Sequence, residues 1–130
     1  MSRRKIVVLG SGPLARMVGG ILSADDSVEL VGFTDAERER HGEVLCGRPV
    51  LGGDELLADL RRQGVTHALI GAGIPALRAR LARVLEELGF ELATAVHRMA
   101  YVAPEVILGR GVIVLPGVVL ADNPVIGENV

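Results

Sequence analysis

The stretch VHRMAYVAPEVILGRGVIVLPGVVLADNPVIGENV, residues 96–130, has an apolar residue at every sixth position. The members of this first beat are Val96, Val102, Leu108, Val114, Leu120 and Ile126. A second beat, broken only by Pro124, lies four places later and consists of Ala100, Val106, Val112, Val118 and Val130. A period of six fits neither an α-helix nor an ordinary strand. It is typical of a hexapeptide β-helix, in which each unit forms one side of a triangular coil.

The six-residue pattern is still running at the last residue, Val130. Three units close one coil, so the stretch supplies about two coils, fewer than the usual minimum of about three repeats. An open apolar sheet end is normally covered in a folded protein. We therefore expect this chain to be the N-terminal portion of a longer protein.

Composition narrows the class of protein. The chain has 130 residues, of which 49% are hydrophobic and 2% aromatic, and its net charge is −2. This length suits one domain plus a piece of another. The lack of a basic stripe and the small number of aromatic residues argue against a nucleic-acid partner. No stretch reaches the roughly 18 apolar residues of a membrane span. Cys46 is alone, which excludes a disulfide framework and a cysteine metal site and favours a cytoplasmic protein.

The first 95 residues alternate between strand and helix patterns. A buried apolar run predicts a strand at 5–10, and apolar residues with helical spacing after Pro13 predict a helix over 13–24. The other expected elements are strands at 28–34, 49–51 (an edge strand), 66–71 and 91–96, with helices from Asp54, as N-cap, to Gly64 and over 75–88. Short connections between such elements imply a parallel sheet covered on both faces by helices.

The predicted fold class is therefore α/β. We interpret residues 1–95 as a small Rossmann-like parallel-sheet domain, and residues 96–130 as the first coils of a β-helix. No low-complexity linker separates the two, and Arg98-Met99 is the expected joint.

The first candidate binding feature is the turn Gly10-Ser11-Gly12-Pro13-Leu14-Ala15, between the first strand and the first helix. Glycines allow a ligand to approach the backbone closely, and free N–H groups at a helix start attract phosphate. The position is the one that a phosphate-binding turn requires, although the pattern is a G-x-G-x-x-A variant. A tight turn without a ligand is the alternative.

Two further features lie at strand ends. Asp35 ends the second strand and could accept hydrogen bonds from ribose hydroxyls, or it could be a solvated turn residue. Gly71-Ala72-Gly73 ends the third long strand, and Arg78 follows it and could bind phosphate. Arg78 could equally be a surface arginine on an arginine-rich helix. Ligands of open parallel sheets lie outside the carboxyl ends of the strands, so these features should lie together.

The sequence predicts no catalytic residue and no metal site. His41, His67 and His97 share no metal-ligand spacing and have no evident acidic partner, so we expect each to be non-catalytic. No Ser-His-Asp or Cys-His set can be assembled.

Together, these residues resemble the bacterial nucleotide-sugar acyltransferases of the PglD/NeuD type. The resemblance lies in the Gly10-Ser11-Gly12 turn, in Asp35, and in Leu69-Ile70-Gly71-Ala72-Gly73 with Arg78. It continues through 96–103 and the hexapeptides of 108–119, and so covers the whole chain. A Rossmann-like domain that runs directly into hexapeptide repeats is an unusual combination.

The resemblance implies a homotrimer whose left-handed β-helix holds acetyl-CoA between subunits, while the N-terminal domain holds a nucleotide-linked amino sugar. It implies acyl transfer to the sugar, with a histidine beyond residue 130 as general base, so this chain alone should be inactive. Carried over as candidate nucleotide-sugar contacts are Gly10, Ser11, Gly12, Asp35, Gly71, Ala72 and Gly73. The family turn usually has the order Gly-Ala-Gly-Gly-His-Ala, whereas here Pro13 removes one N–H donor and Leu14 replaces the imidazole.

Two other functions stay open. An NAD-binding Rossmann module without acyltransferase activity fits Gly12, Ala15 and Asp35, but leaves the six-residue beat unexplained. A purely structural assembly domain, which trimerises without a ligand, is the other.

Overall fold

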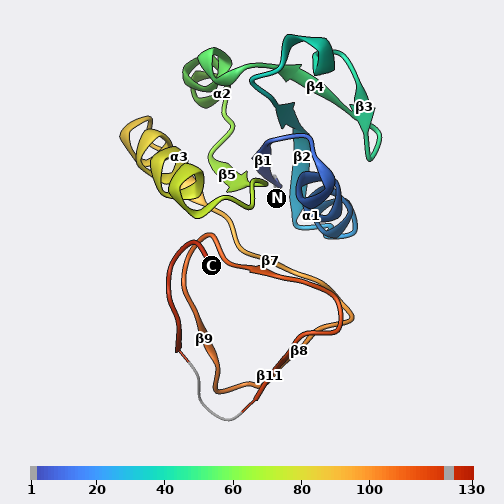
Figure 1. The fold of residues 1–130 in the computed structure, drawn as a ribbon, viewed down its shortest axis with the longest axis vertical. Helices are drawn as coiled ribbons and strands as arrows, with labels where there is room; N and C mark the ends of the chain where they lie inside the picture. Colours follow the sequence, from blue (N-terminus) through green and yellow to red (C-terminus); the bar gives the residue numbers. More distant parts are fainter. Residues whose placement is uncertain (1–2, 122–124) are drawn as a thin grey trace.

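The computed structural model describes residues 3–121 and 125–130 and shows two connected parts (Figure 1). A twisted sheet with helices on both faces forms the N-terminal part, and a triangular coil lies beneath it. The predicted α/β class, a Rossmann-like domain followed by β-helix coils, is therefore confirmed.

The main sheet has the strand order β3-β4-β2-β1-β5-β6. Its strands are β1 (Arg4–Leu9), β2 (Val28–Thr34), β3 (Val44–Leu45), β4 (Arg48–Gly52), β5 (His67–Ile70) and β6 (Glu91–Leu92). All neighbouring pairs are parallel except β3 with β4. Going outward from β1, the chain order runs through β2 and β4 on one side and through β5 and β6 on the other. The switch point of the sheet therefore lies between β1 and β5, where open α/β sheets bind ligands.

The predicted edge strand at 49–51 is wrong in its position. β4 lies inside the sheet, and the edge belongs to β3. Cys46 and Gly47, with φ of 52° and 76°, turn the chain back between the paired residues Leu45 and Arg48. Positive φ at both central residues is the signature of a tight hairpin turn, which the charged sequence around it did not reveal.

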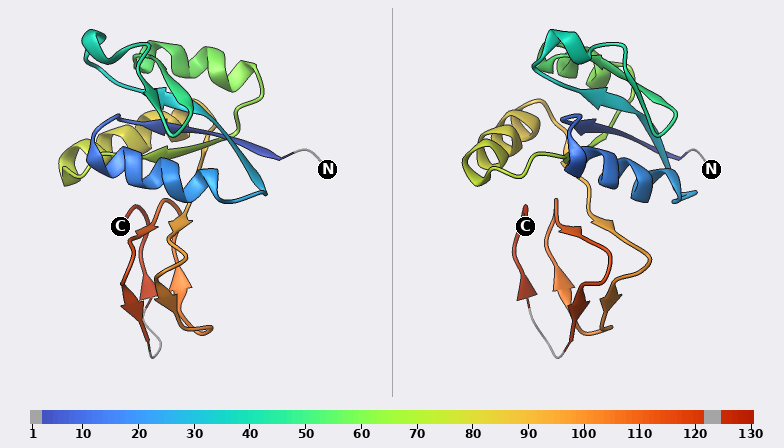
Figure 2. Two further views of the ribbon diagram at one scale, coloured as in Figure 1. Left: turned by 90° about the vertical axis from the view of Figure 1, so that its right-hand side faces the viewer. Right: turned by 45° about the vertical axis from the view of Figure 1, so that its right-hand side comes forward.

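Helices cover the sheet on both faces (Figure 2). α1 (Pro13–Ser23) packs on one face through buried residues such as Val18 and Leu22. α2 (Leu57–Arg62) and α3 (Pro75–Glu87) pack on the other face, where Leu57, Leu81 and Leu85 join a second core. The single-turn helices are η1 (Arg38–Arg40) and η2 (Asp54–Leu56).

The helix after Gly52-Gly53 begins differently from the prediction. Asp54 is the first residue of η2 and not an N-cap, because no side chain caps either η2 or α2. Its carboxylate instead accepts a hydrogen bond of 3.4 Å from the Thr34 hydroxyl, at the end of β2. The carboxylate thus faces the strand ends rather than the helix start.

The lower part consists of short strands stacked in parallel pairs. They are β7 (Ala95–Val96), β8 (Tyr101–Val102), β9 (Ile107–Leu108), β10 (Ile113–Val114), β11 (Val119–Leu120) and β12 (Val125–Ile126). β10 pairs with β7, β11 with β8 and β12 with β9, each with an offset of 18 residues. That offset equals three hexapeptides per coil, as the beat predicted.

The coil is left-handed. In Figure 1 the chain runs clockwise from β7 through β8 to β9. In the left view of Figure 2 the C-terminal red strands lie on the side that faces the viewer of Figure 1. A path that turns clockwise as it approaches the viewer is left-handed, which agrees with the hand that the family resemblance implies.

The aliphatic beat is buried unevenly. Val112 and Val114 are 1% and 3% exposed, whereas Val96 is 38% exposed. Each of the two coils has a neighbouring coil on one side only, so several inward side chains keep some contact with solvent. Pro124, where the second beat breaks, lies outside the described residues.

The predicted single strand at 91–96 is two strands in two sheets. β6 continues the main sheet, while β7 already pairs with β10. The two parts share a core at this point, because Ile113 of β10 packs against the same cluster as Ala93 and Ala95. The limits of the two units, 1–95 and 96–130, stay a prediction.

No helix within residues 3–121 and 125–130 has the length and apolar character needed to cross a membrane.

Candidate nucleotide-sugar site

The first β–α turn is shaped by Gly10. Gly10 has φ of +106°, a left-handed conformation that favours glycine, and its N–H donates a hydrogen bond of 2.7 Å to the Thr34 carbonyl. A Cβ at Gly10 would lie 3.0 Å from the Gly71 carbonyl oxygen. The turn therefore lies directly against the end of β5.

Close packing between the end of β5 and the start of α1 explains why both Gly71 and Ala15 are small residues. The Gly71 N–H donates to the Leu9 carbonyl at 2.7 Å. A Cβ at Gly71 would lie 2.8 Å from the Ala15 Cβ and 2.9 Å from its Cα. Ala15, at the last position of the G-x-G-x-x-A pattern, thus allows α1 to approach the sheet, which is the role of that position in dinucleotide-binding turns.

A cavity of about 370 Å³ opens at these strand ends. Its wall includes most of the predicted site residues, namely Gly10, Ser11, Gly12, Asp35, Gly71 and Ala72. Leu77, Arg80 and Leu81 of α3 and Asp54 of η2 complete much of the remainder. A wider cleft of about 960 Å³ lies between α1 and β7, but none of the predicted site residues lines it. We therefore take the smaller cavity as the candidate site.

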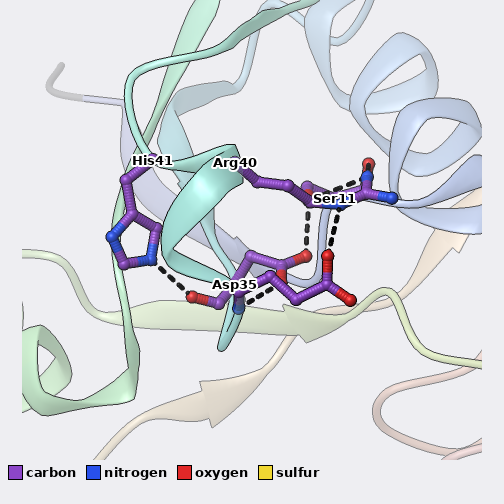
Figure 3. A network of polar contacts seen from close by, with 5 residues as sticks. Ser11, Asp35, Arg40 and His41 are labelled. Carbon is purple, nitrogen blue, oxygen red and sulfur yellow. Dashed lines mark hydrogen bonds and ion pairs between the residues drawn. The ribbon is translucent and has the colours of Figure 1, made fainter.

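Asp35, which lines the cavity, is held by a polar network (Figure 3). One carboxylate oxygen accepts a hydrogen bond of 2.5 Å from the Ser11 hydroxyl, and the other accepts 2.8 Å from the Glu37 N–H. The Arg40 guanidinium donates to the Ser11 carbonyl at 3.2 Å, and His41 Nε2 donates to the Asp35 carbonyl at 2.7 Å. The loop after β2 is thereby tied to the glycine turn.

This network lowers the pKa of the Asp35 carboxyl below its ordinary value. Partial burial acts in the opposite direction and is the largest single influence. The hydrogen bonds from Ser11 and Glu37, with the nearby positive charge of Arg40, outweigh it. Asp35 is therefore a carboxylate at neutral pH, which can only accept hydrogen bonds.

Three predicted site residues are not brought to the cavity. Pro13 begins α1 with its ring exposed, and Gly73 is exposed on the loop before α3; neither lines the wall. Arg78 is only 9% exposed and donates to the carbonyls of Ile70 and Ala72 at 2.7 and 2.8 Å. Burial lowers the pKa of its guanidinium, although an arginine remains protonated in proteins.

Two charged residues of the wall were missed in the sequence. Arg80 is exposed at the cavity, two positions after Arg78 on the same helix, and Asp54 projects from η2. The signal for Arg80 was the arginine-rich start of α3, which did not show which arginine faces the strand ends. For Asp54 the only signal was its position two residues after the end of β4.

The three histidines lie apart from the cavity wall. His67 contacts Glu91 at 3.1 Å, and His97 accepts the Met99 N–H through Nδ1 at 3.1 Å. His41 touches the site only through its bond to the Asp35 backbone. Within the described residues, no group of three potential metal ligands is assembled.

A comparison with protein-family models matches residues 5–85 to the PglD N-terminal domain. The match covers more than half of the chain. The chain belongs to the PglD N-terminal domain family. A comparison with curated protein sequences returns no match.

Solved structures extend the similarity beyond the family domain. A histidine mutant of perosamine N-acetyltransferase from Caulobacter crescentus, in complex with CoA and GDP-perosamine, is 34% identical with a TM-score of 0.85. This match covers 95% of the PglD-like chain and 57% of that enzyme. The acetyltransferase domain of PglB from Neisseria gonorrhoeae, in complex with acetyl coenzyme A, is 25% identical with a TM-score of 0.83, covering 98% and 60%.

A third match shows the fold alone. RSP, a Rex-family repressor, in complex with beta-NADH is 18% identical with a TM-score of 0.59, and the match covers 98% of the chain and 53% of RSP. The chain thus spans a little over half the length of the solved relatives that it matches.

Proposed function

We propose that this chain supplies the nucleotide-sugar-binding part of an acetyl-CoA-dependent acyltransferase that acts on a nucleotide-linked amino sugar. The observation that carries the proposal is one cavity formed by the glycine turn, Asp35 and the Gly71-Ala72 wall, in a chain that continues directly into a β-helix. The enzyme from Caulobacter crescentus, with the same two-part fold, holds both CoA and a nucleotide sugar, which supports this proposal.

The charges around the cavity suit a nucleoside diphosphate. The carboxylates of Asp35 and Asp54 can accept hydrogen bonds from ribose hydroxyls or from N–H groups of a base. Arg80 provides the positive charge that a diphosphate requires. The proposed contacts are therefore Gly10, Ser11, Gly12, Asp35, Asp54, Gly71, Ala72 and Arg80.

In the proposed reaction, the sugar amine attacks the thioester carbonyl of acetyl-CoA. A C–N amide bond forms, the C–S bond breaks, CoA leaves as the thiol, and the amine loses a proton to a base. No histidine lines the cavity, so we do not assign the base to His41, His67 or His97. No residue of this chain is assigned to the CoA site.

Trimer formation is part of the proposal. The β7–β10 face of the prism packs against the sheet domain through Ala95 and Ile113. The other two faces present exposed apolar side chains, Tyr101 and Val119 on one and Ile107 and Val125 on the other. A closed ring with head-to-tail contacts needs two different surfaces on each subunit. The two uncovered faces provide them.

The test is a calorimetric titration of the chain with GDP, UDP, NAD and CoA, together with an acetyl-transfer assay on the same protein. We expect a nucleoside diphosphate to bind more tightly than NAD, and no turnover by these 130 residues. Tighter binding of NAD would overturn the proposal. Robust turnover would show that the base lies within this chain.

A cytoplasmic location stays a prediction from the lone Cys46.

NAD binding is the second candidate because Asp35 ends β2, where dinucleotide-binding domains hold a ribose. Both carboxylate oxygens of Asp35 already accept hydrogen bonds. Pro13 also lacks the N–H that would face a pyrophosphate at the start of α1. Both observations apply equally to the ribose and diphosphate of a nucleotide sugar, so the nucleotide sugar is favoured instead by the β-helix that follows the sheet domain and by the match to the enzyme that holds GDP-perosamine.

A further inference from the structure

Arg78 lies between the candidate site and the β-helix. Its Nη1 donates to the carbonyl oxygens of Ile70 and Ala72, at the end of β5. Ala72 is part of the cavity wall. The planar guanidinium therefore fixes the direction in which the chain leaves β5, and with it one side of the cavity.

The opposite edge of the same guanidinium reaches the second coil of the β-helix. Nη2 donates to the Asn129 Oδ1 at 2.7 Å and to the Gly111 carbonyl at 3.3 Å. Nε lies 3.4 Å from the Asn129 carbonyl, and the Asn129 side-chain amide donates back to the Arg78 carbonyl at 3.2 Å. Residues 51 positions apart in sequence are thus joined by hydrogen bonds in both directions.

Asn129 is held in place on its own side. Its φ is +60°, a left-handed conformation that asparagine tolerates better than most residues, and its N–H donates to the Arg110 carbonyl at 2.7 Å. The side-chain amide therefore points at Arg78 from a constrained backbone. In Figures 1 and 2 the C-terminal segment accordingly ends next to the underside of the sheet domain.

No carboxylate forms an ion pair with Arg78 among the residues that the structure describes. A buried cation whose only partners are neutral acceptors depends on each of its hydrogen bonds, because losing one leaves a charged donor unpaired and destabilises the fold. The apolar contact of Ile113 with the sheet domain holds the two parts together but is not directional. The bonds of Arg78 are directional and buried, so they restrict how the two parts are oriented, alongside the exposed ion pair between Arg110 and Glu86 of α3.

We propose that Arg78 and Asn129 form a latch that couples the wall of the nucleotide-sugar cavity to the second β-helix coil, with Arg78 as a positioning residue. The inference rests on the proposed function, because acyl transfer is the reason why the two parts must be held in a fixed relative orientation. A sugar held by one part must reach a thioester held by the other, and a misplacement of about 1 Å can cost 100-fold in rate. The latch sets this alignment, and the wall around Ala72 responds to contacts made in the β-helix.

The test uses Asn129→Gly in the complete chain. Glycine accepts the left-handed backbone of this position, so the substitution removes the side-chain amide without straining the turn. Asn129→Asp is the matched variant, since it keeps an acceptor for Nη2. Glu128→Ala is the control, because Glu128 is exposed and pairs only with Arg110. The readouts are the Kd for GDP and for UDP, and amide hydrogen exchange at residues 71–74 without a ligand.

We expect Asn129→Gly to weaken binding of the nucleotide at least fivefold and to speed exchange at residues 71–74. Asn129→Asp and Glu128→Ala should stay within twofold of the parent in both readouts. Unchanged affinity in a folded Asn129→Gly protein would overturn the proposal, even if its stability falls, because a purely structural tether would behave in that way.

Failure of the proposed function would look different. If the parent chain binds neither GDP nor UDP, the nucleotide-sugar proposal fails, and hydrogen exchange alone decides the latch. Faster exchange at residues 71–74 in Asn129→Gly would then support coupling between the two parts. Unchanged exchange would overturn it.

Discussion

The Ser11 hydroxyl donates a hydrogen bond of 2.5 Å to the Asp35 carboxylate, which joins the first β–α turn to the end of the second strand. Ser11 is fully buried although it lies in a turn. The Glu37 N–H donates a hydrogen bond to the other oxygen of the same carboxylate. The charged form of Asp35 is thus a structural element of the site as well as a possible ligand contact.

The lowered pKa of Asp35 predicts a specific pH dependence of stability. A carboxyl with a lower pKa in the folded than in the unfolded state stabilises the fold above its unfolded pKa of about 3.9, and this contribution is lost as the pH falls through the folded pKa. Asp35→Asn should therefore be less stable than the parent at pH 7, by about 1 kcal/mol. The difference should shrink below pH 4.

Urea unfolding of both proteins between pH 7 and pH 3 measures this difference. Asp25, whose pKa is also lowered by its bonds to Ser27, contributes to both proteins and cancels in the comparison. A gap between parent and Asp35→Asn that stays constant down to pH 3 would contradict the assigned pKa direction.

Gly71 and Gly73 form a matched pair for testing the close approach of α1 to β5. A Cβ at Gly71 would clash with Ala15, whereas a Cβ at Gly73 would have no neighbour within 4 Å. Gly71→Ala should lower the free energy of unfolding by about 1–3 kcal/mol. Gly73→Ala should change it by less than about 0.5 kcal/mol. Equal effects, measured by urea unfolding, would show that the packing at the turn is looser than described.

Arg80 should contribute to binding of the diphosphate, and Arg83 on the same helix should not. Both side chains are exposed, but only Arg80 lines the cavity. Arg80→Ala is expected to weaken GDP binding roughly tenfold, about 1.4 kcal/mol, through loss of a charge-assisted hydrogen bond. Binding of guanosine, which has no phosphate, should stay unchanged. An equal loss in Arg83→Ala would indicate a general charge effect instead.

The interior of the β-helix should tolerate truncation at Val96 better than at Val112. Val112 is 1% exposed, and Val96 is 38% exposed at the start of the coil. Val112→Ala should cost about 2 kcal/mol, from lost burial and the cavity left behind. Val96→Ala should cost less than about 1 kcal/mol. Thermal unfolding of both variants checks this order, and its reversal would mean that the inner wall is assigned wrongly.

Most of the fold could be predicted because its signals are periodic. The strand over 28–34 agrees at both ends with β2, and the six-residue beat predicted the coil offset. The β3–β4 hairpin and the split of residues 91–96 were missed. Both features depend on which sheet a short strand joins. A strand of two residues has too few side chains to show in the sequence which strand it pairs with.

The candidate site was predicted in part for a related reason. Residues at the ends of parallel strands meet because of topology alone, so Gly10, Asp35 and Gly71 could be grouped without coordinates. Asp54 could not be grouped with them, because the direction of its carboxylate depends on the single turn of η2 and on the hydrogen bond from the Thr34 hydroxyl.

The sequence alone determined that a doubly wound sheet leads into a three-sided coil and that the candidate binding groups lie together at the strand ends, because residue spacing and the order of the strands can be read from the sequence. Only the tertiary structure decided between Arg78 and Arg80. Residues two apart on an α-helix point about 200° away from each other, so one faces the β-helix and the other the cavity. Which one does so depends on how α3 is rotated against the sheet, and its packing sets that rotation.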